Sequence, residues 1–426
     1  MGKRCHIGAK KPTVNRLFGP LVILICLFAV HQPAVRAQQH ATFLTEKEAV
    51  QRGLNRSEVQ QILEASHARA ESAVTKAQTW PNPSFDYARE TSDEGDGDTT
   101  ENFFSVSQQV DVSGRRKLEV EAARQRLGAT AQDNAAWQQE RTSTIRRQFF
   151  ETLYLQRFQA AHSGWLGRMD AIEDVMRKRE SAGDISGYDL RRLQRERAFV
   201  QAERKRIRAE YERMIEELHG LIGGERSWST LSGSLLPPQL PSLAALLQRL
   251  PGRPELAAMK LQQQALATEE RIGERWWIPE ITLSLGAKTV DTPSGDGSGL
   301  LLGASIPIPV FDRDAAERQR SRAKSNLIRS EHRLALARSE GRVRGLWRQA
   351  SDLTKDAHSF EVQSEKTSGS LIATAEAAYK AGEIGVLEIL DAYRSAFEDE
   401  ARALSLMREA RMARIELDSI TGGNTQ

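Results

Sequence analysis

Side chains that could do catalytic or metal chemistry are few in this sequence, and they are not grouped. Beyond residue 37 the histidines form no pair at i and i+4 (His40, His67, His162, His219, His332, His358). Zinc sites need several such ligands close together. Residues 183–187 lack the spacing of a nucleophile elbow, and the glycine-rich residues 295–299 precede a strand, whereas phosphate-binding loops precede a helix. We therefore predict no catalytic residue, cofactor or metal site, and hence no enzyme.

One acidic pair has a spacing that matters for ion passage. Glu388 and Asp391 lie at i and i+3, so a helix places both carboxylates on one face. Carboxylates around a passage attract cations and repel one another. The alternative interpretation is an ordinary solvated helix face. Residues 91–102 hold five acids and no base, and we interpret them as a solvated loop.

The first 37 residues have the pattern of a secretory signal peptide. Basic residues precede an apolar run at 21–30, which is too short to span a bilayer, and residues 35–37 offer a cleavage site. Both cysteines, Cys5 and Cys26, lie in this segment, and a lipidated Cys26 is the alternative. Removing its six basic residues from the total of 60 leaves 54 against 57 acidic residues, a net charge of −3. This balance argues against nucleic-acid binding.

Composition limits the remaining classes. A mean hydropathy of −0.51 over 426 residues excludes a polytopic helical membrane protein. Two cysteines exclude a disulfide scaffold. Only 6% of the residues are aromatic, while Ala, Glu, Gln, Arg and Leu are abundant, and this composition favours long helices.

The chain beyond the signal contains an internal sequence repeat. Ala182-Gly183-Asp184-Ile185 returns as Ala381-Gly382-Glu383-Ile384, an offset of 199, and the Gly-Gly pair at 223–224 returns at 422–423. We predict repeats over 38–225 and 241–426, joined by a Pro-rich linker over 226–240.

Each repeat has the same order of elements. A helix comes first, over about 45–79 in one repeat and 253–277 in the other. Period-2 alternation then predicts strands over 84–90 and 103–112, and over 281–290 and 300–310. Helical hairpins follow over 115–221 and 313–421. Because no proline interrupts their first ~67 residues, each is expected to reach roughly 100 Å. Apolar spacing of 3 and 4 on the last helix indicates coiled-coil packing.

Four strands are too few to close a barrel, since the smallest bilayer-spanning barrels have eight. If these strands lie in a membrane, several copies must pool them, because open edges in lipid leave backbone groups unpaired. A half-buried soluble sheet would give the same alternation, and the pattern alone leaves both interpretations open.

Several motifs resemble the TolC family of outer membrane efflux factors over essentially the whole length beyond the signal. They are Trp80-Pro81-Asn82-Pro83, the run Gln-Gln-Val-Asp-Val-Ser-Gly-Arg-Arg at 108–116 and Tyr-Lys-Ala-Gly-Glu-Ile at 379–384. Trp-Pro-Asn-Pro and Pro-Ile-Pro-Val-Phe-Asp-Arg-Asp at 307–314 are most similar to the CzcC-like, cation-efflux branch. In that branch Asn-x-Gly follows Phe-Asp-Arg, and here Asp314-Ala315-Ala316 follows it.

The resemblance implies an α+β membrane protein of the cell outer membrane, with coiled-coil helical hairpins extending into the periplasm. It implies a homotrimer whose twelve pooled strands form a lipid-embedded barrel. It also implies two partners, a periplasmic adaptor (membrane fusion protein) and an inner-membrane pump of the resistance-nodulation-division type. The cargo expected from the branch is divalent heavy-metal cations. Multidrug export and type I protein secretion are alternatives, and a secreted coiled-coil structural or adhesion protein is a second one.

The resemblance also assigns candidate residues. Both hairpin tips are candidates for adaptor docking, with simple helix reversal as the other interpretation (Gly183, Asp184, Ile185, Ser186, and Gly382, Glu383, Ile384, Gly385, Val386). Tyr379 matches an entrance tyrosine, and Glu388 and Asp391 match acidic entrance rings that gate the tunnel. Ile384 occupies a position where a family member carries a gate arginine.

Overall fold

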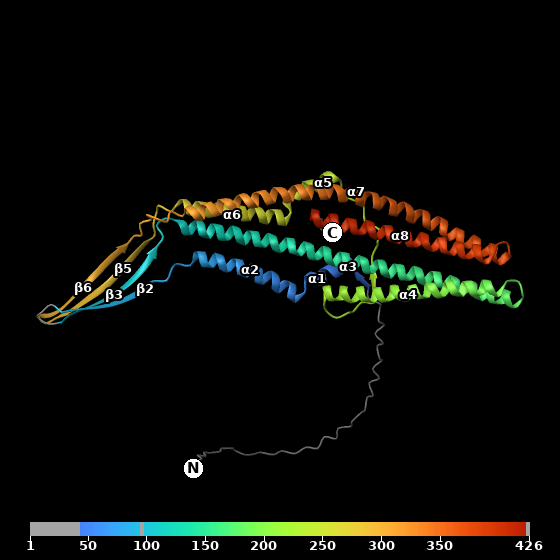
Figure 1. The fold of residues 1–426 in the computed structure, drawn as a ribbon, viewed down its shortest axis with the longest axis horizontal. Helices are drawn as coiled ribbons and strands as arrows, with labels where there is room; N and C mark the ends of the chain where they lie inside the picture. The colour runs from blue at the N-terminus through green and yellow to red at the C-terminus, as the bar shows by residue number, and fades with distance from the viewer. Residues whose placement is uncertain (1–42, 94–97, 423–426) are drawn as a thin grey trace, which may run out of the picture. The chain divides into compact units, whose positions relative to one another are not determined.

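Two hairpins of long helices are the largest elements of the fold (Figure 1). The computed structural model describes residues 43–93 and 98–422, apart from the side chains of 364–368. The expected signal peptide and residues 94–97 therefore lie outside the described residues. Helices α3 (Arg115–Ser181) and α7 (Ala315–Ala381) have 67 residues each. Their return helices α4 (Gly187–Ile222) and α8 (Val386–Thr421) have 36 each.

Glycine in the left-handed region ends each long helix. Gly183 and Gly382 have φ angles of 82° and 79°, which residues with a Cβ rarely adopt. Ser186 then begins α4, because its hydroxyl accepts a hydrogen bond from the Asp189 amide at 3.3 Å. The Ala-Gly-acid-Ile runs therefore reverse the chain direction within a few residues.

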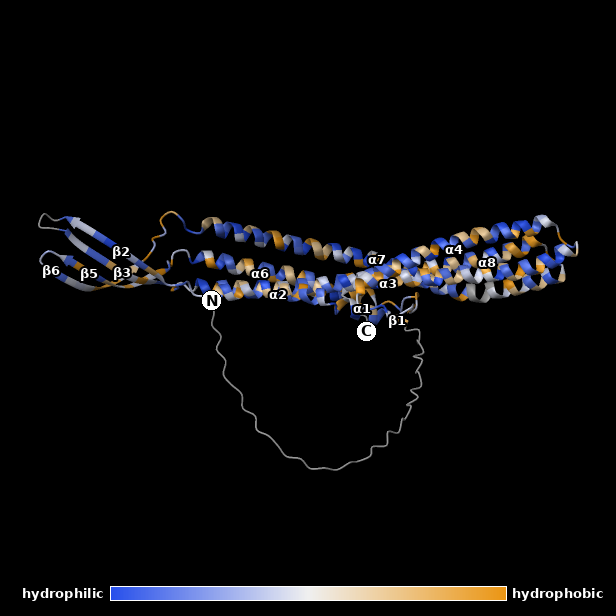
Figure 2. Ribbon diagram, turned by 90° about the horizontal axis from the view of Figure 1, so that it is seen from below, coloured by the Kyte–Doolittle hydropathy of each residue, from blue (hydrophilic) through white to orange (hydrophobic). Residues whose placement is uncertain are grey.

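The helices pack side by side in two groups of four. Toward the hairpin tips the order is α4, α3, α8, α7 (Figure 1). Toward the sheet it is α2 (Ser57–Gln78), α3, α6 (Pro254–Glu274), α7, and Figure 2 shows the same helices coloured by hydropathy. Helix α3 thus has neighbours on both sides along its whole length.

A four-stranded antiparallel sheet lies at the ends of the helices opposite the tips (Figure 1). Its order is β2 (Ser84–Asp93), β3 (Asp98–Val110), β5 (Ile281–Thr292), β6 (Gly295–Ser305). One register row runs through Tyr87, Phe104, Ala287 and Leu300. Strands β2 and β6 are the two edges.

The strands differ from the sequence prediction at their polar ends. β2 reaches Asp93, β3 begins at Asp98, and β6 begins at Gly295, so most of the acidic loop expected at 91–102 and the loop expected at 291–299 is strand. β6 ends at Ser305 instead of 310, because Pro307 and Pro309 have no amide hydrogen to donate to a ladder.

The first expected helix is broken in two. Helix α1 (Glu46–Leu54) ends at Asn55, and Arg56, which precedes α2, has an extended ψ of 139°. The Arg56 guanidinium donates to the Gly220 carbonyl at 2.5 Å, near the end of α4. The break therefore ties the N-terminal helices to the end of the first hairpin.

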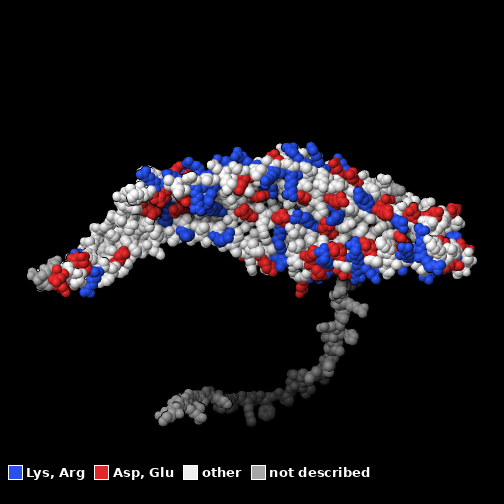
Figure 3. Space-filling view, viewed as in Figure 1, with Lys and Arg blue, Asp and Glu red and all other residues white. Residues whose placement is uncertain are grey.

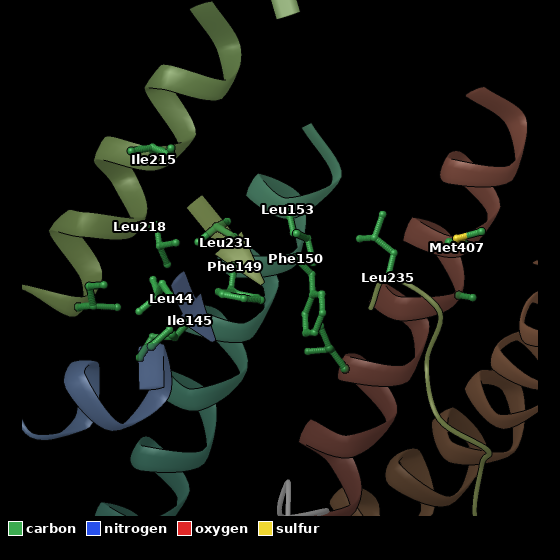
Figure 4. Close-up of a cluster of buried hydrophobic side chains, with 14 of the residues drawn as sticks. Leu44, Ile145, Phe149, Phe150, Leu153, Ile215, Leu218, Leu231, Leu235 and Met407 are labelled. Atoms are coloured by element: carbon green, nitrogen blue, oxygen red, sulfur yellow. The ribbon is translucent and has the colours of Figure 1, made fainter. Parts of the chain in front are cut away.

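Three short elements lie outside the long helices and the four-stranded sheet. One is at the start of the described chain, one is within the expected linker, and one directly follows the linker. Strands β1 (Phe43–Thr45) and β4 (Thr230–Ser232) pair in parallel, and helix α5 (Leu243–Arg249) follows. The two strands cover a central core that includes Leu44, Phe149, Leu218 and Leu231, all at most 2% exposed (Figure 4), whereas Leu246 of α5 packs in a separate cluster with residues of α7 and α8. The linker is thus packed against the helices.

Candidate functional site

The sheet has one face of exposed apolar side chains, which we call the apolar face. It consists of Phe85, Tyr87, Phe104, Val106, Leu283, Leu285, Leu300 and Leu302. Leu300 and Leu302 are 84% and 83% exposed. Tyr87 and Phe104 lie in contact at one end of this face, with ring centroids 5.1 Å apart. So large an exposed apolar surface marks a site for lipid or for another protein.

The opposite face, which we call the polar face, carries mainly small and polar side chains. Besides Phe103, Val290 and Leu301 it consists of Ser84, Asp86, Ala88, Glu90, Glu101, Ser105, Ser107, Ser284, Gly286, Lys288, Gly299 and Gly303. The Ser84 and Ser107 hydroxyls lie 2.7 Å apart, and Ser107 also donates to Asp86 at 3.3 Å. The hydroxyl and carboxylate groups of this face can bind water.

The sheet curls toward its polar face. In the two central strands the polar-face residues are half-buried while the apolar-face residues are exposed, although among the described elements no helix makes extensive contact with the sheet. Gly286 permits this curvature, because a Cβ there would lie 2.5 Å from the Phe104 carbonyl oxygen. The curl therefore shelters the polar face and leaves the apolar face open.

Charged side chains are distributed unevenly along the length of the sheet. Figure 3 shows acidic and basic atoms gathered at the far end of the sheet, with an uncharged stretch between them and the helices. None of the described helices is long and apolar enough to cross a membrane.

The sheet is fixed to the long helices by a short polar junction. Asp111 accepts hydrogen bonds from the amides of Ser113, Gly114 and Arg116, which ends β3 and starts α3. Gly114, immediately before α3, has a φ of 68°, and the equivalent position before α7 is Asp314, a non-glycine residue with a φ of 53°. Its carboxylate pairs with Arg115 at 2.6 Å, which joins the two repeats.

The hairpin tips present mainly polar groups to solvent. Of the candidate docking residues, Asp184, Ser186 and Glu383 are exposed, as are the glycines 183, 382 and 385. Ile185 and Ile384 pack against the core between the hairpins. Val386 is only 6% exposed, so its side chain offers little to a partner. The apolar members anchor the turns.

Tyr379 lies inside the helix pack and is 1% exposed. Burial raises the pKa of its hydroxyl, and the neighbouring Arg179 opposes that rise. Glu388 and Asp391 are exposed on one face of α8, on the side away from the buried Ile389 and Leu390. Within the described part of the chain neither carboxylate has an ion pair. The structure thus separates the tyrosine from the two acids.

An arginine that the sequence did not single out joins the two tips. Arg179, in the last turn of α3, donates to the Tyr379 backbone carbonyl at 3.0 Å. Its guanidinium carbon also lies 5.2 Å from the centre of the Tyr379 ring. The one sequence signal was a basic residue in the last turn of a helix, where cations satisfy carbonyls.

Aromatic rings connect the hairpins farther from the tips. His162 and Trp165 of α3 contact Phe397 of α8, with centroids 4.6 and 4.4 Å apart. Burial lowers the pKa of His162, with the Phe158 carbonyl at 2.9 Å from its Nδ1 opposing that shift. Across the described residues no three His, Cys, Asp or Glu side chains are arranged to hold a metal ion.

Comparison with known proteins gives a consistent result. Residues 246–423 match the family described as outer membrane efflux protein. The chain is 23% identical to the cobalt-zinc-cadmium resistance protein CzcC of Cupriavidus metallidurans over 321 residues, 74% of this chain and 75% of that protein. It is also 23% identical to the nickel-cobalt-cadmium resistance protein NccC of Alcaligenes xylosoxydans xylosoxydans, over 62% of each. The solved structure of CusC superimposes with a TM-score of 0.73 at 17% identity, covering 93% of this chain and 96% of that one.

Proposed function

We propose that this chain, a TolC-like outer membrane efflux factor, is the duct of a tripartite system that exports divalent heavy-metal cations. Its role as an outer membrane efflux channel follows from the family match and the relatives. The trimer, the partners and the cargo are the proposal.

The observation that carries the proposal is the curled sheet with an uncovered apolar face and two unpaired edges. Edges of this kind must be paired inside lipid, since each unsatisfied backbone group there costs several kcal/mol. Copies of the chain can pair β6 of one with β2 of the next and continue the sheet. The family supplies the number three, which gives twelve strands. The equal lengths of α3 and α7, and of α4 and α8, are what a duplicated unit would produce.

The cargo assignment rests on the relatives. CzcC and NccC are named for resistance to cobalt, zinc, cadmium and nickel. A duct needs no tight metal site, because conduction requires that ions leave as readily as they enter. Multidrug export and type I protein secretion remain the alternatives for the same duct.

The tips and the acidic pair have roles in this assembly. Asp184, Ser186 and Glu383 are exposed where a periplasmic adaptor loaded by an inner-membrane pump would dock. Glu388 and Asp391 of three copies would form two acidic rings at the entrance, which attract cations. Tyr379 would support this entrance from within the helix pack.

A pair of neighbouring leucines tests the membrane assignment. Leu302 belongs to the apolar face, whereas Leu301 points to the opposite side of β6. In a bilayer Leu302→Lys costs about 2–4 kcal/mol near the midplane and prevents insertion, while Leu301→Lys is tolerated. We expect the parent protein and the Leu301→Lys variant to form a trimer in the outer-membrane fraction. The Leu302→Lys variant should not form this trimer.

The same pair gives a different result for a secreted coiled-coil adhesion protein. There Leu302 faces water and Leu302→Lys is harmless, and the chain remains monomeric without detergent. That outcome would overturn the duct. For the cargo, deleting the gene should lower tolerance to zinc, cobalt and cadmium, and loss of drug tolerance alone would overturn the metal assignment.

A further inference from the structure

The polar face carries one ion pair beside an aromatic ring. The Lys288 ammonium lies 2.5 Å from the Glu101 carboxylate and 5.1 Å from the centre of the Phe103 ring. Lys288 and Phe103 are directly paired across β5 and β3. Both charged side chains are half-buried, at 31% and 25% exposure, because the sheet curls around them.

The register places this group level with one end of the apolar face. The row containing Phe103 and Lys288 is adjacent to the row of Tyr87, Phe104, Ala287 and Leu300. That row ends the apolar face on the side of the strand tips, farthest from the helices. In the next row toward the strand tips, Arg89 of β2 is paired with Asn102. The Arg89 side chain is exposed and lies on the side of the sheet opposite to Lys288.

We infer that Lys288, Glu101 and Phe103 form a charge-compensated collar inside the duct near its outer mouth, and that Lys288 keeps Glu101 from retaining cations on their way out. This inference rests on the proposed duct. Three unpaired Glu101 carboxylates around a narrow passage would attract and hold divalent cations, as carboxylate rings do in cation channels. The Lys288 ammonium offsets the charge of each Glu101, and Glu90, the register partner of Glu101 on the same face, then contributes the remaining carboxylate, so the exit binds cations more weakly than it would without Lys288.

The collar can be tested by local thiol chemistry, because the only cysteines of the chain are Cys5 and Cys26, inside the expected signal peptide. Ser105→Cys places a thiol on the polar face opposite Gly286, diagonal to Lys288 and about 7–8 Å from it. Its rates of modification by a cationic and by an anionic methanethiosulfonate are measured on intact cells. The unsubstituted protein gives the background, and the ratio of the two rates reports the local potential.

Opposite changes are expected from removing the two charges. Lys288→Gln should raise the cationic-to-anionic rate ratio about two- to fourfold at ~0.1 M salt, and the change should shrink at ~1 M. Glu101→Gln should lower the ratio, and the double substitution should return it near the parent value. Arg89→Gln is the matched control, because it removes a basic residue from the opposite face, and it should leave the ratio unchanged.

The outcomes separate this inference from the duct itself. If Lys288→Gln and Glu101→Gln shift the ratio in the same direction, or neither shifts it, the collar is overturned while the duct stands. A second thiol, Val106→Cys on the apolar face, should be unreactive in the membrane. If it reacts as fast as Ser105→Cys, the sheet is not embedded in lipid, and the proposed function falls.

Discussion

Arg179 makes a polar connection between the two hairpin tips, and we expect this connection to control how easily the tips separate. Arg179→Ala removes a guanidinium–carbonyl hydrogen bond of 3.0 Å and a contact with the Tyr379 ring at 5.2 Å. A hydrogen bond from a charged donor contributes about 1.5–3 kcal/mol, and a partly exposed cation–ring contact about 0.5–1 kcal/mol. Because water reaches part of the Arg179 side chain, we take the lower end, about 2 kcal/mol in total.

Amide hydrogen exchange measures this loss directly. The Gly382 and Glu383 amides close the end of α7 by bonding to the Tyr379 and Ala378 carbonyls at 3.1 and 2.9 Å. They exchange when the tip opens locally. A decrease of about 2 kcal/mol in the opening free energy accelerates their exchange about 30-fold. The experiment uses the purified full chain in detergent, with mass spectrometry of peptides covering residues 376–386.

Arg177→Ala is the matched control. Arg177 is two residues away on α3 and is 59% exposed, and its ion pair among the described residues is with Glu173 of the same helix, at 2.6 Å. Such i,i+4 pairs contribute about 0.3–0.5 kcal/mol, so its removal should change the exchange at most about twofold. Equal exchange in the two variants would refute a connection between the tips through Arg179.

Three further predictions concern stability and pH. Phe149 of α3 is fully buried in the central core, so Phe149→Ala should lower the free energy of unfolding by about 3–5 kcal/mol in urea titrations. Burial holds the pKa of His162 below the 6.5 of an unfolded chain, so protons bind the unfolded state first and stability should fall as the pH drops below about 6.5. The charged groups near this ring are Glu203 and Arg206 of α4 and Glu400 of α8. The His162→Gln variant should flatten the pH dependence of the urea midpoint between pH 7.5 and 5. An unchanged slope would contradict the assignment of this pH dependence to His162. At the junction, Asp314→Ala and Asp314→Gly both lose the pair with Arg115, but only glycine relieves the φ of 53°, so the Gly variant should be about 1–2 kcal/mol more stable than the Ala variant, and equal thermal midpoints would count against backbone strain.

Local patterns in the sequence were sufficient for the elements whose signal is local. The absence of proline over 115–181 and the glycine turns at 183 and 382 predicted the long helices, and period-2 alternation predicted the strand centres. The strand ends were not predictable in this way. Residues 90–93 are polar, and residues 295–299 are mostly glycine, yet both are strand because their partners continue the register.

Contacts between residues far apart in the chain could not be predicted from spacing. Arg411 of α8 donates to the carbonyls of Ser234 and Leu236 at 2.6 and 2.5 Å and to that of Leu235 at 3.1 Å, which holds the expected linker against the core. Burial lowers the pKa of this guanidinium to about 10. In the sequence Arg411 is one arginine among many, and nothing in its neighbourhood indicates a partner 175 to 177 residues away.

The helices give a second argument for pooling copies, independent of the strands. Helix α3 lies between α2 and α6 near the sheet and between α4 and α8 near the tips. Helix α7, its counterpart in the second repeat, has α6 and α8 on one side, and among the described elements no second pair of helices on the other. That free side carries exposed apolar residues such as Leu327 and Leu334, while α2 and α4 expose Ile62 and Phe199. If the second repeat packs as the first does, an α2 and an α4 of another copy would lie on the free side of α7. The proposed pairing of β6 with β2 of the next copy places the same neighbour there, so the helices and the sheet support one arrangement.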